Sequence, residues 1–133
     1  MTGLDTNVLA RFLTRDDPKQ FAAAARLIAE AERRGLKLIV SPVVLCELVW
    51  VLETAYDLPR ATVATTLEKI FHTVEFETLE KDLLWPALDD YRAGPGDFSD
   101  YYIGRRNRQA GAEFTWTFDK HLKTSSHFRL ATA

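Results

Sequence analysis

The sequence predicts an α/β fold in which a short, mainly parallel β-sheet is flanked by helices. Asp17-Pro18 and Ser41-Pro42 each combine a capping residue with proline at the first helical position, which is typical of a helix start. The apolar run Leu36–Val40 between them indicates a buried strand. Because parallel strands need a crossover that is usually a helix, this alternation predicts a parallel sheet covered on both faces.

The other elements follow in chain order. A very short opening strand ends at Asp5, and helices are expected from Pro18 to about Arg34, closed by Gly35, and from Pro42 to about Tyr56. Leu58-Pro59 marks a break before the next helix. The remaining elements are a helix at about 60–72, a weak strand at 74–76, a helix at 79–92 that Pro86 kinks or delays, a loop at 94–96, a helix from 98 or 99 to 110, a strand at 112–117 and an edge strand at 128–130.

Length and composition narrow the class of protein. The 133 residues fit one compact domain, residues 1–133. Seventeen basic and nineteen acidic residues give a net charge of -2, so the chain as a whole does not indicate nucleic-acid binding. The single cysteine, Cys46, excludes an internal disulfide and a cysteine-based zinc site. The lack of a signal peptide or membrane span predicts a soluble, cytoplasmic protein with no membrane partner.

Four acidic residues are expected near one edge of the sheet. Asp5 ends the first strand, Glu47 lies in the second turn of the helix after the second strand, and Asp119 follows the strand at 112–117. Asp100 opens the preceding helix, and the loop through Gly96 can bring it to the same edge. Open parallel sheets bind ligands beyond the carboxyl ends of their strands.

Each acid also has a simpler interpretation. Glu47 is surrounded by apolar neighbours, where an unpaired carboxylate is costly to bury, unless it lies on a narrow solvent-facing seam of its helix. Asp5 can be a cap or an Asx-turn, and Asp119 a turn residue. Asp100 can simply be a negative charge that interacts favourably with the dipole at a helix N-terminus. Asp97 is more typical of a cap or loop residue than of a metal ligand.

Taken together, the four carboxylates predict a cation site. Their mutual repulsion requires a cation, and an all-oxygen set suits Mg²⁺ or Mn²⁺ rather than zinc or copper. The three histidines show no ligand spacing and are interpreted as surface or packing residues; they are His72, His121 and His127. Such an ion activates water and neutralises phosphodiester charge, so the expected substrate bears phosphate.

Five segments of the chain carry a family resemblance, and they are Leu4–Leu9, Asp16–Pro18, Ser41–Leu52, Asp97–Gly104 and Thr117–Asp119. In this order and at these intervals they resemble the PIN-domain nucleases, and among these the VapC toxins of bacterial type II toxin–antitoxin systems. The resemblance covers nearly the whole chain and implies a PIN-like three-layer fold.

The resemblance also implies an activity and partners. It implies a Mg²⁺- or Mn²⁺-dependent endoribonuclease whose catalytic and metal-binding acids are Asp5, Glu47, Asp100 and Asp119, with Asp97 as an extra acid. Cleavage would leave 5'-phosphate and 3'-hydroxyl ends on RNA. The implied assembly is a homodimer that forms a heterotetramer or larger complex with a VapB-type antitoxin, which alone would contact promoter DNA.

Supporting roles are assigned to residues next to the acids. Thr6, Asn7 and Thr117 are expected to hold carboxylates by hydrogen bonds, although both threonines also suit ordinary strand ends. A basic cluster is a candidate for RNA phosphates or a solvated helix face, and it consists of Arg105, Arg106 and Arg108. Trp116 and Phe118 are expected in the sheet core rather than as base-stacking platforms.

Two other functions remain open from the sequence. A non-catalytic binding module would keep the fold and bind only a protein partner. A receiver-like phosphotransfer domain would need a phosphoacceptor aspartate on a central strand and a later lysine, and neither is evident. The sequence leaves open whether tRNA, rRNA or mRNA is the substrate.

Overall fold

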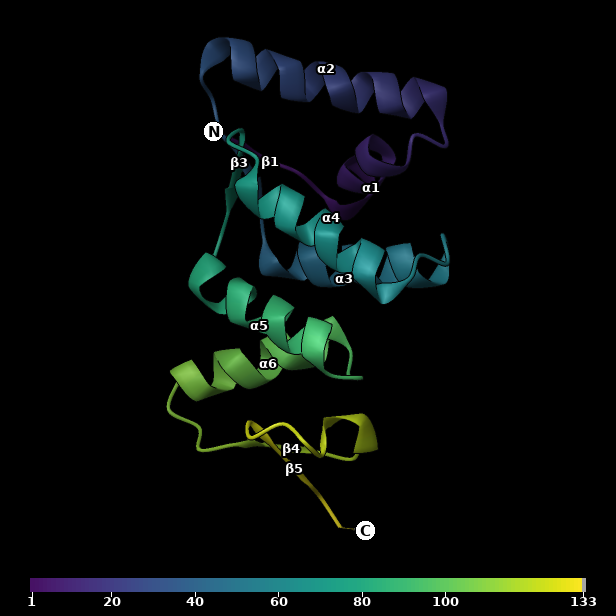
Figure 1. The fold of residues 1–133 in the computed structure, drawn as a ribbon. Helices are drawn as coiled ribbons and strands as arrows, with labels where there is room; N and C mark the ends of the chain where they lie inside the picture. The colour runs from purple at the N-terminus through teal and green to yellow at the C-terminus, as the bar shows by residue number, and fades with distance from the viewer. Residues whose placement is uncertain (133) are drawn as a thin grey trace. The chain divides into compact units, whose positions relative to one another are not determined.

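The computed structural model describes residues 1–132 and divides the chain into two compact units. The first unit is Met1–Glu80, and the second begins at Lys81. In Figure 1 the first unit runs from purple to teal and the second from green to yellow. That residues 1–133 form a single domain stays a prediction.

The first unit is a three-stranded parallel sheet with four helices. Its strand order is β1-β2-β3, with Leu38 of β2 opposite both Thr2 and Phe76. Helix α1 packs against α2 and α3, and α3 packs against α4. The elements are β1 (Thr2–Gly3), α1 (Thr6–Thr14), α2 (Pro18–Arg34), β2 (Leu38–Val40), α3 (Pro42–Thr54), α4 (Arg60–His72) and β3 (Phe76–Thr78).

The local signals of α2 act as predicted. The Asp17 side chain accepts a hydrogen bond from Gln20 N, proline occupies the first turn, and Gly35 ends the helix with φ of 62°. Ser41 caps α3 through Val44 N in the same way. Both helices therefore begin at the expected residues.

Two expectations for the first unit need correction. Helix α1 was not predicted, although Asp5 at its start and the spacing of Val8, Leu9 and Phe12 are helical signals. Strand β3 lies two residues later than the expected 74–76. Its position is set by pairing with β2, which buries Phe76 and Thr78 and leaves Val74 exposed.

The second unit is a helix pair with a two-stranded parallel sheet. Helix α5 packs against α6, where Tyr91 and Phe98 meet edge to face with ring centroids 6.0 Å apart. Strands β4 and β5 pair in parallel, with Thr115 opposite Phe128. The elements are α5 (Lys81–Ala93), α6 (Phe98–Gln109), β4 (Thr115–Thr117), the 3-10 helix η1 (Lys120–Leu122) and β5 (Phe128–Leu130).

The expected elements of this unit form with shifted ends. Helix α5 begins at Lys81 and continues through Pro86, and β4 is shorter than the expected 112–117. Each described strand pair is parallel, as predicted, but the strands form two sheets, one in each unit, rather than one. Among the described residues, no helix combines the length and apolar character that crossing a membrane requires.

Candidate active site

Asp5 stands where the first strand passes into α1. It is exposed, and its Oδ1 accepts a hydrogen bond from Val8 N at 2.9 Å, which makes it the N-cap of α1. The capping role considered for this residue is therefore present. One carboxylate oxygen is held by the helix start, so the side chain has a fixed direction at the end of β1.

Glu47 is joined to the same place by a hydrogen bond from the neighbouring helix. Thr6 Oγ1 donates to Glu47 Oε1 at 2.8 Å, across the contact between α1 and α3. This is the kind of support expected of Thr6. Asn7 is exposed and, with Asp5 and Val8, lines a cavity of about 290 Å³ between α1 and α2.

The surroundings of Glu47 differ from the buried setting considered above. Glu47 is exposed, on a helix face shared with Val43 and Trp50, which are 67% and 66% exposed. Leu45, Leu48 and Leu52 form the buried face of α3 instead. Glu47 thus lies on a solvent-facing seam of α3 and is not buried, and that it binds a metal ion stays a prediction.

Three further acids gather in the second unit. Asp97 occupies the N-cap position of α6 without a side-chain capping bond, and Asp100 lies in the first turn. Partial burial, together with the negative charges of Asp97 and Asp119, raises the pKa of the Asp100 carboxyl. Asp100 is therefore the point where negative charge accumulates in this unit.

Asp119 is held by its own backbone neighbours. Its N–H donates to Thr117 Oγ1 at 3.0 Å, and its Oδ1 accepts from His121 N at 2.9 Å. His121 Nδ1 also lies 3.0 Å from that oxygen. Thr117 thus fixes the turn that carries Asp119, and His121 is a neighbour of this acid that the sequence did not indicate.

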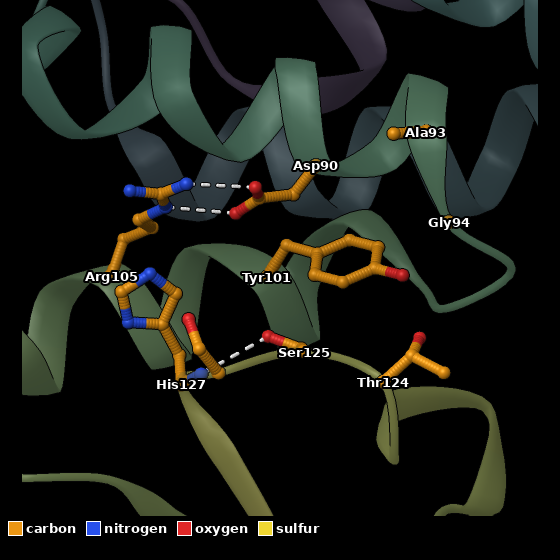
Figure 2. Close-up of a pocket in the computed structure, with 9 residues that line it drawn as sticks. Asp90, Ala93, Gly94, Tyr101, Arg105, Thr124, Ser125 and His127 are labelled. Atoms are coloured by element: carbon orange, nitrogen blue, oxygen red, sulfur yellow. Dashed lines mark hydrogen bonds and ion pairs between the residues drawn. The ribbon is translucent and has the colours of Figure 1, made fainter.

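The three arginines have different surroundings. Arg105 makes a two-pronged ion pair with Asp90, with both N–O distances 2.8 Å, beside a polar cavity of about 280 Å³ (Figure 2). Arg108 donates to the Glu113 carbonyl oxygen, while Arg106 is exposed. Arg105 is half-buried, so by exposure alone Arg106 and Arg108 are the more accessible of the three.

The cavity in Figure 2 has a histidine on one side. His127 is half-buried, and its Nδ1 has no hydrogen-bond partner among the described residues. Burial and then the charge of Arg105 lower its pKa, so the ring favours the neutral form. His72 and His121 lie at the surface, as expected.

The prediction for two aromatic residues is wrong. Trp116 is 64% exposed and Phe118 is 75% exposed, so neither belongs to a core. A two-stranded sheet packed on one side leaves the side chains of its other face in solvent, and alternation along one strand does not reveal which face is covered.

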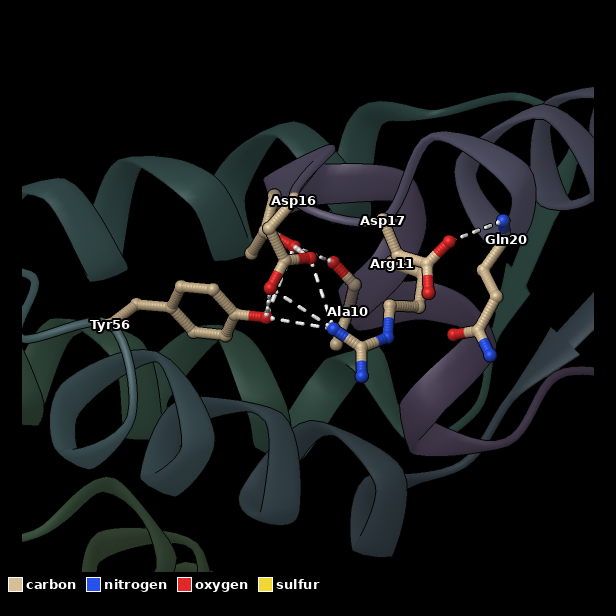
Figure 3. A network of polar contacts seen from close by, with 7 residues as sticks. Ala10, Arg11, Asp16, Asp17, Gln20 and Tyr56 are labelled. Atoms are coloured by element: carbon tan, nitrogen blue, oxygen red, sulfur yellow. Dashed lines mark hydrogen bonds and ion pairs between the residues drawn. The ribbon is translucent and has the colours of Figure 1, made fainter.

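A polar cluster at the C-terminal end of α1 was not predicted. Arg11 Nη1 lies 3.0 Å from Asp16 Oδ1, and Tyr56 Oη donates to Asp16 Oδ2 at 2.6 Å (Figure 3). The Tyr56 bond, aided by bonds from Thr14 and Arg11, lowers the pKa of Asp16 to about 2. The cluster links the connection between α1 and α2 to the residues that follow α3. Its partners Asp16 and Tyr56 are 40 positions apart, so the sequence gives no local signal for their contact.

The acids therefore fall into two sets, one in each unit. Within either unit taken alone, residues 1–132 contain no group of three acidic, histidine or cysteine side chains placed to hold a metal ion. That Asp5, Glu47, Asp100 and Asp119 form one site stays a prediction.

Comparisons with known proteins give the family. A family model described as PIN domain matches residues 4–125. The chain is 28% identical over 120 residues to a VapC ribonuclease from Aquifex aeolicus (strain VF5), covering 90% of this chain and 88% of that protein. No solved structure matches the chain significantly. The predicted resemblance and α/β class are confirmed, and because the model spans most of the sequence, the chain belongs to the PIN domain family.

Proposed function

We propose that this protein is a metal-dependent endoribonuclease of the VapC type. The similarity to a VapC ribonuclease along 90% of the chain supports a nuclease of this class. The observation that carries the proposal for this chain is the Thr6–Glu47 hydrogen bond beside Asp5. It directs a second carboxylate toward the start of α1, where an acid already stands.

The donor set fits a hard divalent cation. Asp5, Glu47, Asp100 and Asp119 offer only carboxylate oxygens, which suit Mg²⁺ or Mn²⁺. When bound, such an ion would lower the pKa of a water molecule and neutralise negative charge on a phosphodiester. Asp97 would add negative charge at the same place without being required as a ligand.

The remaining residues would position this set. The Val8 amide fixes one oxygen of Asp5, and the Thr6 hydroxyl fixes one oxygen of Glu47, leaving the second oxygen of each carboxylate to face an ion. Thr117 would hold the turn of Asp119, and Asn7 would line the approach beside Asp5. Arg106 and Arg108 would reach RNA phosphates.

The proposal extends to partners. A small VapB-type antitoxin would block the acids and neutralise the activity, and it alone would contact promoter DNA. The protein would act as a cytoplasmic homodimer, in a heterotetramer or larger assembly with the antitoxin. Size measurement of the free protein and of the co-expressed pair tests these assemblies.

The deciding experiment is a cleavage assay on structured RNA. Purified protein should cut in Mg²⁺ or Mn²⁺, stop in EDTA, and lose activity on Asp5→Asn or Asp100→Asn. Undiminished cleavage by either variant would sink the assignment. Sequencing RNA 5' ends after brief expression of wild type and Asp100→Asn would identify the target. A titration that finds no Mn²⁺ affinity would support a non-catalytic binding module instead.

A further inference from the structure

The β4–β5 sheet is covered by α6 on one face. Asn107 Nδ2 of α6 donates to Thr115 Oγ1 of β4 at 3.0 Å. Phe128, the partner of Thr115 on β5, is buried, and a Cβ on Gly104 of α6 would lie 2.6 Å from its ring. The absence of a side chain at Gly104 therefore lets α6 approach this face closely.

The opposite face carries aromatic side chains. Side chains alternate along a strand, so Trp116 points away from the face that Thr115 occupies, and Phe114 and Phe118 flank it directly outside β4. Arg129 lies opposite Trp116 in the register, and its guanidinium carbon is 4.0 Å from the centroid of the Phe114 ring. We name Phe114, Trp116, Phe118 and Arg129 the aromatic face.

The aromatic face is open to solvent. Trp116 in β4 is 64% exposed, and Phe118, directly after β4, is 75% exposed. Phe114 braces Trp116 edge to face, with ring centroids 4.8 Å apart. Neighbouring exposed rings of this size mark an interaction surface more often than single scattered apolar residues do.

The charge around the aromatic face selects the kind of partner. Residues 105–129 contain six lysines and arginines and two acids, a net charge of +4, whereas the whole chain has -2. Among these cations, Arg129, Lys120 and Lys123 are exposed. Exposed rings beside cations suit a ligand that combines flat bases with phosphates, because stacking is worth about 1–3 kcal/mol per base.

The position of the aromatic face relates it to the acids. Phe118 directly precedes Asp119, so a base stacked on Phe118 lies one residue from a proposed metal ligand. A duplex keeps its bases stacked inside, whereas an unpaired segment can present them to aromatic side chains. The aromatic face therefore suits single-stranded RNA more than paired RNA.

We propose that the aromatic face binds unpaired RNA bases by stacking on Trp116 and Phe118, with Arg129 contacting phosphate. This proposal rests on the proposed ribonuclease function and adds to it a base-binding surface next to Asp119. An aromatic docking site for a protein partner is the competing use of the same surface.

The test measures binding apart from cleavage. A fluorescent single-stranded RNA of roughly 12 nucleotides is titrated in EDTA with full-length protein, by anisotropy, and its fully paired duplex is titrated in parallel. The single strand should bind more tightly than the duplex. Trp116→Ala and Phe118→Ala should each weaken single-strand binding by about tenfold or more, as expected for a lost stacking contact.

Matched variants separate stacking from folding. Val74→Ala removes an exposed apolar side chain that lies outside the proposed site and should leave binding unchanged. Trp116→Phe should retain most of the affinity, and Arg129→Ala should reduce the salt dependence of binding. Thermal melting of each variant checks that the fold persists.

The outcomes distinguish this inference from the function on which it rests. Wild-type affinity in folded Trp116→Ala and Phe118→Ala, or equal binding of the single strand and the duplex, would overturn the stacking proposal. Neither result would change the outcome of the cleavage assay with Asp100→Asn, which tests the proposed function separately. If Trp116→Ala abolished the binding of an antitoxin-type peptide and left RNA binding unchanged, the aromatic face would be assigned to a protein partner instead.

Discussion

The two acid sets are held in different ways. In the first unit, Asp5 and Glu47 are exposed, and each accepts a hydrogen bond from a neighbour, Val8 N or Thr6 Oγ1. In the second unit, Asp100 is half-buried and faces the like charges of Asp97 and Asp119. Both acids of the first set are oriented by donors, whereas the second set, in which Asp119 also accepts from His121 N, concentrates negative charge at Asp100.

This difference separates two requirements of a cation site. The carboxylates must be oriented, which requires hydrogen-bond donors that fix their rotamers. They must also attract the cation, which requires negative charge that no neighbouring cation neutralises. We infer that a substitution in the first unit acts mainly on geometry, and that one in the second acts mainly on charge.

The largest effect is expected on cleavage. Asp5→Asn and Asp100→Asn should each reduce the rate by at least about 100-fold, since each removes a charge that the reaction uses. The rate is measured on structured RNA in Mg²⁺. An Asp100→Asn enzyme that cleaves at the wild-type rate would exclude the charge-concentrating set from the site.

The same two variants should differ in stability in EDTA. The pKa of Asp100 is higher in the folded protein than its ordinary value of 3.8. The contribution of this carboxyl to folding stability is therefore fully present below pH 3.8, and it is lost as the pH rises through the folded pKa. At neutral pH the ionised group therefore opposes folding, and Asp100→Asn should raise Tm. Asp5→Asn should leave Tm nearly unchanged, because asparagine also caps helices.

The next effect concerns Thr6. Thr6→Val removes the donor to Glu47 while keeping nearly the same shape, and should weaken Mn²⁺ binding about 10- to 100-fold, as loss of a supporting hydrogen bond does. Isothermal titration measures this change. Thr65→Val is the matched control, since Thr65 Oγ1 donates to the Ala61 carbonyl oxygen within α4.

A smaller effect separates the two roles of Asp5. Asp5→Ala should cost about 1 kcal/mol of unfolding free energy through the lost cap, whereas Asp5→Asn should cost only a few tenths. Chemical denaturation measures both values. Equal stability of the two variants would mean that the Val8 hydrogen bond contributes nothing to α1.

The smallest effect concerns acid stability. Asp16 has a folded pKa of about 2 against an ordinary value of 3.8, so its stabilising contribution is complete above the ordinary value and is lost as pH falls through the folded value. Thermal melting between these pH values should show less acid sensitivity in Asp16→Asn. Tyr56→Phe should give an intermediate profile, because it removes only the strongest hydrogen bond to Asp16.

Local signals predicted the fold better than the site. Helix α2 was predicted with its observed bounds, because its cap, proline and terminal glycine act within a few residues of one another. The Asp16–Tyr56 bond and the Thr6–Glu47 bond join residues about 40 positions apart, and no local pattern encodes such a pairing. Trp116 and Phe118 were misplaced because alternation gives two faces without saying which one α6 covers.

The spacing of the acids along the chain has a consequence for synthesis. Asp5 can be capped as soon as α1 exists, because its donor is three residues away. Glu47 is oriented only when α3 packs on α1, and Asp119 is added near the C-terminus. Under the proposed function, a chain truncated before residue 119 lacks a required carboxylate. Premature termination or proteolysis would therefore release fragments without ribonuclease activity.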